Sequence, residues 1–364
     1  MTDNYNDKRK INKYEKMLTH QTFKYNQEIE LELGGKLNNL ELYYTTYGKL
    51  NPTRSNVIWV CHAFTGNSNF QDWWPGLFGP GLLYDPEEYF IICANMPGSC
   101  YGSTGPLSVN PVTGIPYYHS FPELTNRDIL RTFGILREHL EIPKIHTVIG
   151  CSLGGQQALE WAVSEPELFD NLVAIGTNAY HSPWGIAFNE TQRMAIKQDL
   201  TWGLSTDTAG ESGMKIARAI ALISYRNYNT YKATQSEEDV DKTDGFKACS
   251  YQAYQGEKLA RRFNAFSYWY LSKTMDSHNV GRGRGSVEKA LERVKAKSLF
   301  IGMETDILFP IPEQQYLASE VDTGEFAMID SLYGHDGFLL EPEKLTRVIR
   351  AFYGKSQIKR EMVA

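Results

Sequence analysis

The sequence predicts an α/β fold with a mostly parallel central sheet, flanking helices and an inserted helical cap. The first observation is a series of short apolar runs typical of buried parallel strands. They lie at residues 56–60, 90–94, 145–149, 172–175, 298–302 and 326–329. The second is helical periodicity between these runs, at about 126–139 and 156–163. The third is a long segment, from about 180 to 294, with helical periodicity and aromatic residues but almost no strand pattern. Strands that alternate with helices indicate a layered α/β domain, and the helical block indicates a cap.

These patterns divide the chain into three parts. Residues 1–20 are rich in Asn, Lys and Asp and are expected to form a flexible tail. Residues 21–180 and 296–364 are expected to form the core, beginning with one or two antiparallel hairpins between 23 and 47. Residues 181–295 are expected to form the cap.

Composition excludes several classes of protein. Of the 364 residues, 42% are hydrophobic, which is enough for a substantial core. The formal net charge of −6 and the scattered Lys and Arg residues provide no basic surface for nucleic acid or an anionic membrane. No run approaches the ~20 apolar residues that a membrane span needs, and the first 19 residues lack the apolar segment of a signal peptide.

The five cysteines have no spacing typical of a zinc site or a thioredoxin motif. They are Cys61, Cys93, Cys100, Cys151 and Cys249. An odd number of scattered cysteines fits a reducing compartment, so we expect a cytoplasmic protein with no bound metal.

A nucleophilic serine is predicted at Ser152. Gly150 and Gly154 flank it in a G-x-S-x-G motif, directly after the apolar run that ends at Ile149 and before the helix that begins near Gln156. This strand–turn–helix context is that of the nucleophile elbow in the α/β-hydrolase fold. In such a sharp turn the residues two before and two after the serine pack together, so both must be glycine. A glycine-rich turn of a nucleotide-binding fold is the plain alternative, and Cys151 is a rival nucleophile one residue from the apex.

A serine hydroxyl needs a base, and the base needs a third group to orient it. In this fold the partners follow the serine in the order acid, then histidine, each after a later strand. Asp306 follows the apolar run 298–302, and His335 follows the run 326–329. Glu304 is the nearest alternative acid. The remaining histidines either precede Ser152 or lie in the cap, where packing or surface roles are expected.

Two backbone N–H groups are expected to bind the oxyanion of the tetrahedral intermediate, each contributing about 3 kcal/mol. One is the amide of Leu153, directly after the nucleophile. The other is expected from the loop after the run 56–60, where Phe64 is the candidate. An ordinary strand-exit loop is the alternative interpretation of this segment.

Several motifs over residues 25–350 resemble those of the homoserine O-acetyltransferase family. They are CHAFTG at 61–66, DWW at 72–74, GSCYGSTGP at 98–106, ALEW at 158–161 and YGHDGFL at 333–339. The resemblance implies a ping-pong reaction of methionine biosynthesis, in which Ser152 takes an acetyl group from acetyl-CoA and the hydroxyl of L-homoserine removes it. The resemblance also implies a homodimer that is joined through the cap. It implies no bound cofactor.

The resemblance also assigns substrate-binding roles to Arg218, Tyr225 and Asp336. The residues themselves agree, because Arg218 and Tyr225 lie seven apart on one apolar helical stripe. An arginine among apolar neighbours needs an anionic partner, which an amino-acid carboxylate could supply, while Asp336 could meet the ammonium group. An internal ion pair of Arg218 is the alternative.

The family elbow usually reads Gly-Gly-Ser-Met-Gly-Gly, and Leu is usual in place of Phe64, so Cys151, Leu153 and Phe64 are departures. These positions line the acyl site, which leaves succinyl-CoA as donor, or serine as acceptor, as alternatives. A serine esterase with the same triad is a further alternative, and an inactive hydrolase fold that serves as a binding module is another.

Overall fold

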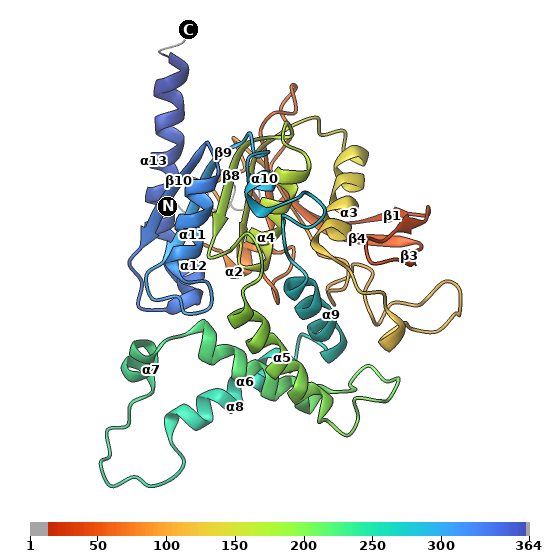
Figure 1. Ribbon diagram of the computed structural model, residues 1–364, viewed down its shortest axis with the longest axis vertical. Helices are drawn as coiled ribbons and strands as arrows, with labels where there is room; N and C mark the ends of the chain where they lie inside the picture. Colours follow the sequence, from red (N-terminus) through yellow and green to blue (C-terminus); the bar gives the residue numbers. More distant parts are fainter. Residues whose placement is uncertain (1–13, 362–364) are drawn as a thin grey trace, which may run out of the picture.

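The computed structural model describes residues 14–361, and a mixed eight-stranded sheet is its centre (Figure 1). The strand order is β1-β4-β6-β5-β7-β8-β9-β10. The strands are β1 (Leu18–Tyr25), β4 (Leu40–Tyr47), β5 (Val57–Cys61), β6 (Phe90–Ala94), β7 (Ile145–Cys151), β8 (Phe169–Ile175), β9 (Lys297–Met303) and β10 (Gly324–Ile329). From β6 to β10 all neighbours are parallel, and only β4 pairs antiparallel, with β1 and β6. The predicted fold class is confirmed.

The N-terminal hairpins are also present, with one correction. Strands β1 and β4 form one antiparallel pair, and a small hairpin of β2 (Ile29–Glu30) and β3 (Lys36–Leu37) lies between them in the chain. Because β1 begins at Leu18, the prediction of a flexible tail to residue 20 is wrong for Leu18–His20: their backbone pairs with Tyr47–Thr45. Residues 1–13 lie outside the described part of the chain.

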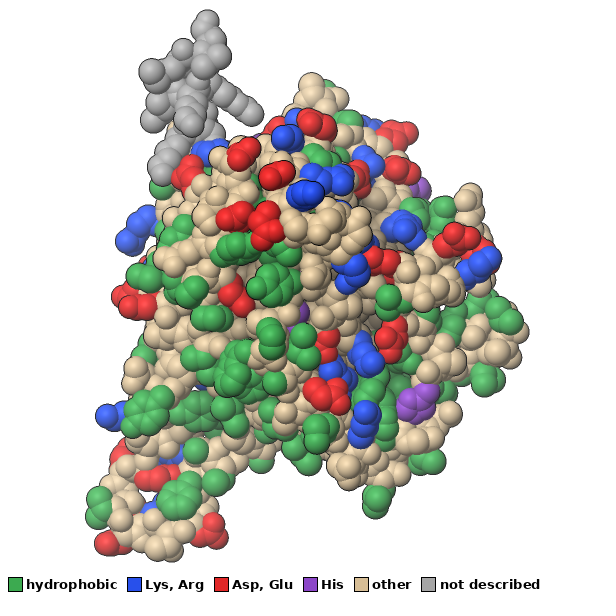
Figure 2. Space-filling model, in the orientation of Figure 1, with side chains coloured by type: hydrophobic (Ala, Val, Ile, Leu, Met, Phe, Trp, Pro, Cys, Tyr) green, Lys and Arg blue, Asp and Glu red, His purple; other side chains and the backbone are tan. Residues whose placement is uncertain are grey.

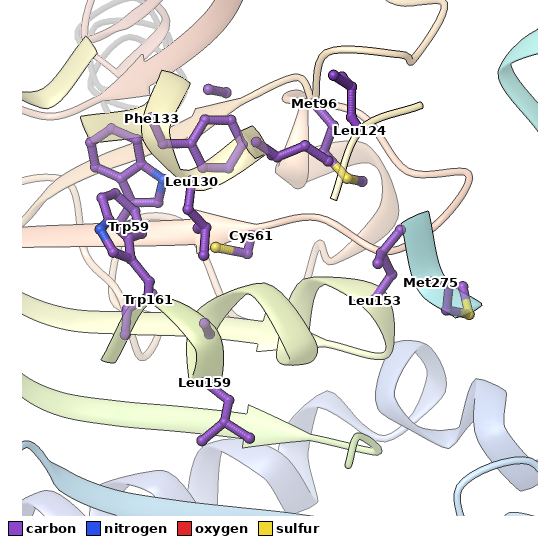
Figure 3. Close-up of a cluster of buried hydrophobic side chains, with 14 of the residues drawn as sticks. Trp59, Cys61, Met96, Leu124, Leu130, Phe133, Leu153, Leu159, Trp161 and Met275 are labelled. Carbon is purple, nitrogen blue, oxygen red and sulfur yellow. The ribbon is translucent and has the colours of Figure 1, made fainter. Parts of the chain in front are cut away.

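Each face of the sheet carries its own apolar core. Along β5, Trp59 and Cys61 belong to a cluster with helices α3 (Asn126–His139) and α4 (Leu153–Ser164), whereas Ile58 and Val60 belong to a second cluster on the opposite face. This alternation follows from the two-residue period of a strand. Figure 3 shows the first cluster between β5, α3 and α4. The second cluster includes α2 (Phe70–Trp73) and α13 (Pro342–Glu361).

The chain between β8 and β9 is helical. It forms α5 (Pro183–Lys197), α6 (Glu211–Tyr225), α7 (Tyr228–Gln235), α8 (Lys247–Ala260), α9 (Ala265–Asp276) and α10 (Val287–Leu291). Helices α5 to α8 lie together beyond one end of the sheet, while α9 approaches it (Figure 1). Tyr268, Leu271 and Met275 of α9 share the apolar cluster of Leu153, the first residue of α4. Met275 and Leu153 are labelled in Figure 3. The cap helices are therefore anchored beside the nucleophile elbow.

The remaining helices follow β9 and β10. They are α11 (Ile311–Glu320), the short 3₁₀ turn η2 (Gly334–Asp336) and α12 (Gly337–Leu340); another 3₁₀ turn, η1, covers Tyr118–Ser120. Within residues 14–361 no helix combines the length and the apolar character needed to cross a membrane.

Candidate active site

The turn between β7 and α4 holds Ser152 in a strained conformation. Its φ is 56° and its ψ −124°, a region that non-glycine residues rarely occupy. A Cβ atom on Gly150 would lie 2.1 Å from the carbonyl oxygen of Gly154, and one on Gly154 would lie 2.1 Å from that of Cys61. Both positions therefore require glycine, as the sequence analysis expected. Ser152 is placed at the N-terminus of α4, where the helix dipole favours developing negative charge.

The rival nucleophile Cys151 points into the core. It is fully buried in the second apolar cluster, and burial raises the pKa of its thiol. A thiol that stays protonated and inaccessible is a poor nucleophile, so its place in the structure agrees with a packing role.

The structure brings Asp306 and His335 into direct contact. Asp306 Oδ2 accepts a hydrogen bond of 2.6 Å from His335 Nδ1, and both side chains are buried, at 0% and 3% exposed. Asp306 Oδ1 accepts two further bonds from the backbone N–H groups of Leu308 and Phe309, at 2.8 and 2.9 Å. The alternative acid Glu304 is exposed, and no hydrogen bond or ion pair joins its side chain to His335 in the described part of the chain. Of the two candidate acids, the structure pairs Asp306 with His335.

Aromatic rings hold the imidazole on two sides. Phe309 stacks on the His335 ring with centroids 5.1 Å apart, and Phe338 meets it edge-on at 5.2 Å. With Nδ1 bonded to Asp306, Nε2 is the free nitrogen, and it is buried without a hydrogen-bond partner in the described residues. His335 and Ser152 line the same cavity of about 410 Å³. Nε2 therefore makes no hydrogen bond to Ser152 in the described residues. Catalytic hydrogen bonds are often long or poorly aligned without substrate and tighten when it binds.

The two expected oxyanion donors belong to segments next to Ser152. Leu153 is the first residue of α4, where backbone N–H groups have no partner within the helix. Phe64 lies in the loop after β5 and lines the cavity with Ser152. Neither amide donates to a protein acceptor in the described part of the chain.

Helix α6 places Arg218 and Tyr225 in the same cavity. The Arg218 guanidinium lies over the Tyr225 ring, 5.2 Å from its centroid. Burial raises the pKa of Tyr225 to about 12, so its hydroxyl stays protonated. Among residues 14–354 Arg218 has no ion pair, so the internal partner that the sequence analysis considered is not found there.

Asp336 also lines this cavity, next to a cationic side chain that was not expected from the sequence. It lies 3.1 Å from Arg226 Nε, and both side chains are largely buried, at 13% and 19% exposed. An ammonium group would therefore meet a carboxylate that already has one cationic neighbour. No role was expected for Arg226 from the sequence, although this residue directly follows Tyr225 in the chain.

Other residues of the cavity were given no role from the sequence, although Trp73, Phe338 and Leu339 lie in the motifs at 72–74 and 333–339. They include Trp73, Lys258, Arg262, Phe338 and Leu339. They come from separate loops and from the cap, so only the tertiary fold brings them together. No group of three or more metal-ligating side chains suited to a metal ion occurs within residues 14–361.

The sheet order, the elbow at Ser152 and the Asp–His pair behind it define the class of α/β-hydrolase-fold enzymes. A family model described as the alpha/beta hydrolase fold matches residues 56–342. A homoserine O-acetyltransferase of Cyclobacterium marinum is 51% identical over 336 residues, covering 92% of this chain and 95% of that protein. The chain belongs to the homoserine O-acetyltransferase family, and it is an acyltransferase of the α/β-hydrolase class.

Solved structures agree on the fold. A homoserine O-acetyltransferase from Bacillus anthracis superposes with a TM-score of 0.85 at 25% identity, covering 92% of this chain and 97% of that one. An esterase reaches a TM-score of 0.84 at 24% identity, covering 92% of this chain and all of that one, which shows the shared fold alone. The same fold therefore serves both hydrolysis and acyl transfer, and the choice depends on the site.

Proposed function

We propose that this chain transfers an acetyl group from acetyl-CoA to the side-chain hydroxyl of L-homoserine, a step of methionine biosynthesis. Ser152 is the nucleophile, His335 the general base and acid, and Asp306 the group that orients His335. The observation that carries the proposal is one cavity in which Ser152 and His335 meet Arg218, a cation without an ion pair in the described residues. An amino-acid substrate supplies the carboxylate that Arg218 lacks.

In the first half-reaction the Ser152 Oγ attacks the thioester carbonyl carbon while His335 Nε2 takes the hydroxyl proton. The negative charge that develops on the carbonyl oxygen is stabilised by the N–H groups of Phe64 and Leu153. When the intermediate collapses, the C–S bond breaks and the imidazolium returns its proton to the sulfur. CoA leaves as the thiol, and the acetyl group stays on Ser152.

In the second half-reaction His335 takes the proton of the homoserine hydroxyl, whose oxygen attacks the acetyl-serine carbonyl. Collapse breaks the bond to Ser152 Oγ, which recovers its proton from the imidazolium, and O-acetylhomoserine is released. Homoserine competes with water because Arg218, Tyr225 and Asp336 hold the amino-acid end of the substrate. Its side-chain hydroxyl is then kept close to the ester at a high effective concentration. Acetyl-CoA acts here as a substrate, and the steps require no bound cofactor.

The direct test follows release of free CoA from acetyl-CoA with and without L-homoserine. We expect release to depend on the amino acid and O-acetylhomoserine to form in equal amount. Equal CoA release in both mixtures would mean that water is the acceptor and that the chain is an esterase. Parallel reactions with succinyl-CoA and with L-serine identify the donor and the acceptor.

We also propose that the enzyme is a homodimer joined through the cap and that it works in the cytoplasm. Hydrophobic side chains gather over the cap helices (Figure 2), and Ile216 and Ile223 on α6 are 57% and 53% exposed. A second cap could cover them. Sedimentation of the protein and of an Ile216→Glu variant tests the dimer; a monomeric parent protein would contradict it. The free thiols of Cys61, Cys93 and Cys151 are buried, which suits a reducing compartment.

A further inference from the structure

The loop of residues 62–66, which we call the oxyanion loop, is held by two side chains with no assigned role. We propose that His62, from the core, and Arg262, from the cap, are positioning residues that aim the Phe64 N–H group at the reacting carbonyl oxygen. The inference rests on the proposed function in taking that N–H group as an oxyanion donor. It adds that the donor is correctly placed only while the cap contacts the loop.

The orientation of the Phe64 amide follows from its neighbour. The Ala63 carbonyl oxygen accepts hydrogen bonds from His62 Nδ1 at 2.9 Å and from the Gly66 backbone N–H at 2.8 Å. Ala63 C=O and Phe64 N–H belong to one planar peptide group, in which they point in opposite directions when the bond is trans. Fixing the carbonyl of Ala63 therefore fixes the direction of the Phe64 N–H, away from His62 and Gly66.

The tautomer of His62 follows from its second contact. His62 Nε2 lies 3.1 Å from the backbone nitrogen of Met96, and a backbone N–H can only donate. Nε2 must accept this bond, so the ring proton is on Nδ1, where it can be donated to Ala63. The ring is completely buried, and burial lowers the pKa of His62 to about 4, which keeps the imidazole neutral at physiological pH. His62 is thus a fixed link between the oxyanion loop and the segment after β6.

Arg262 holds the other side of the loop. It follows the end of α8, and its Nη1 donates to the Thr65 carbonyl oxygen at 2.6 Å and to the hydroxyl of Tyr101. No ion pair of Arg262 occurs among residues 14–354, so its hydrogen bonds to the core are not shared with a carboxylate. Hydrogen bonds from a charged donor are roughly twice as strong as neutral ones. The contact joins residues 197 positions apart, one in the cap and one in the core.

Two isosteric substitutions of His62 separate the proposed role from simple packing. In His62→Asn the side-chain amide nitrogen stands near the position of Nδ1 and can still donate to Ala63. In His62→Gln the terminal amide reaches the position of Nε2 and can accept from Met96, but the donor to Ala63 is lost. We expect kcat of His62→Asn to stay within about threefold of the parent and kcat of His62→Gln to fall by about 10²-fold, the effect of losing one oxyanion donor.

The Michaelis constant for homoserine should be unchanged in both variants, because Arg218 and Tyr225 of α6 hold the acceptor and make no hydrogen bond to the oxyanion loop among the described residues. Equal loss of kcat in both variants, or a loss that follows the melting temperature alone, would mean that His62 only packs the core. A parent protein that does not transfer the acyl group to homoserine would count against the proposed function. In that case the role of His62 could still be tested by comparing the two variants in the hydrolysis of an acetyl ester.

Arg262 is tested with its neighbour as control. Arg262→Ala should lower kcat about tenfold for acetyl transfer, with little change in the melting temperature, while Arg262→Lys, which can still donate to Thr65, should recover most of the activity. Arg261→Ala removes the same charge from the adjacent residue, which lies outside the catalytic cavity, and should leave kcat unchanged. If Arg261→Ala and Arg262→Ala lose kcat equally, the effect is one of general charge and the positioning role is refuted.

Discussion

Replacing Asp306 by asparagine tests the proposed catalytic assembly most directly, because the structure determines which way the new amide must face. The two backbone N–H groups of Leu308 and Phe309 bond to Asp306 Oδ1 at 2.8 and 2.9 Å. An asparagine has one acceptor oxygen, and leaving two buried donors unsatisfied would cost about 1–3 kcal/mol each. The oxygen therefore stays with these amides, and the NH₂ group faces His335 Nδ1.

Two donors then face each other unless the imidazole moves its proton from Nδ1 to Nε2. With the proton on Nε2, His335 cannot accept the proton of Ser152. Loss of the correct tautomer lowers kcat by about 10⁴-fold in serine proteases. We expect a similar loss here, which corresponds to about 5 kcal/mol of transition-state stabilisation.

The assay is CoA release from acetyl-CoA in the presence of saturating homoserine, with Glu304→Gln as the matched control. Glu304 is an exposed carboxylate two residues away, and its variant should keep full activity. Activity of Asp306→Asn within tenfold of the parent would refute the role of Asp306. A large loss in Glu304→Gln would show that the acid was assigned wrongly.

Three further outcomes are expected. Arg218→Ala should raise KM for the amino acid at least tenfold more than KM for acetyl-CoA, and equal increases would make Arg218 structural. Gly154→Ala should lower the free energy of unfolding by about 2–3 kcal/mol, measured by denaturant titration, because its Cβ would meet the Cys61 carbonyl oxygen at 2.1 Å. Burial lowers the pKa of His181 and of His278 to about 3, so the folded state binds fewer protons than the unfolded one below about pH 6.5. Stability should therefore fall as the pH drops from 6.5 towards 4, by up to about 1.4 kcal/mol per pH unit for each histidine, and a flat denaturation midpoint over this range would contradict it.

The sharp turn around Ser152 could be predicted from sequence because much of its geometry is local. Gly150, Ser152 and Gly154 lie within one turn, and a Cβ atom on Gly150 would meet the carbonyl oxygen of Gly154 in that same turn. The clash at Gly154 is with Cys61 of the neighbouring strand β5, so this second demand for glycine depends on the tertiary fold. Asp306 and His335 could be predicted for a related reason. Parallel strands present their carboxyl ends at one edge of the sheet, so residues that follow successive strands are brought near each other.

The pairing of Asp336 with Arg226 could not be predicted in this way. It depends on how α6 of the cap lies over the turn η2 of the core, and no local pattern specifies that packing. The same holds for the tail, since the alternating pattern was not evident before Phe23, and only pairing with β4 makes Leu18–His20 a strand.

The amino-acid sequence by itself determined the strand–turn–helix of the elbow, the positions of Asp306 and His335 after successive strands and the helical segment between β8 and β9. These features depend mainly on steric contacts between residues close together in the chain and on the spacing of hydrophobic residues, which is visible in the sequence. The tertiary structure alone decided the tautomer of His62, the contact of Arg262 with Thr65 and the ionic neighbour of Asp336. Each of these depends on a hydrogen bond or ion pair between segments that are distant in the chain. These segments come together only when the strands of the core pack side by side and the cap packs against them.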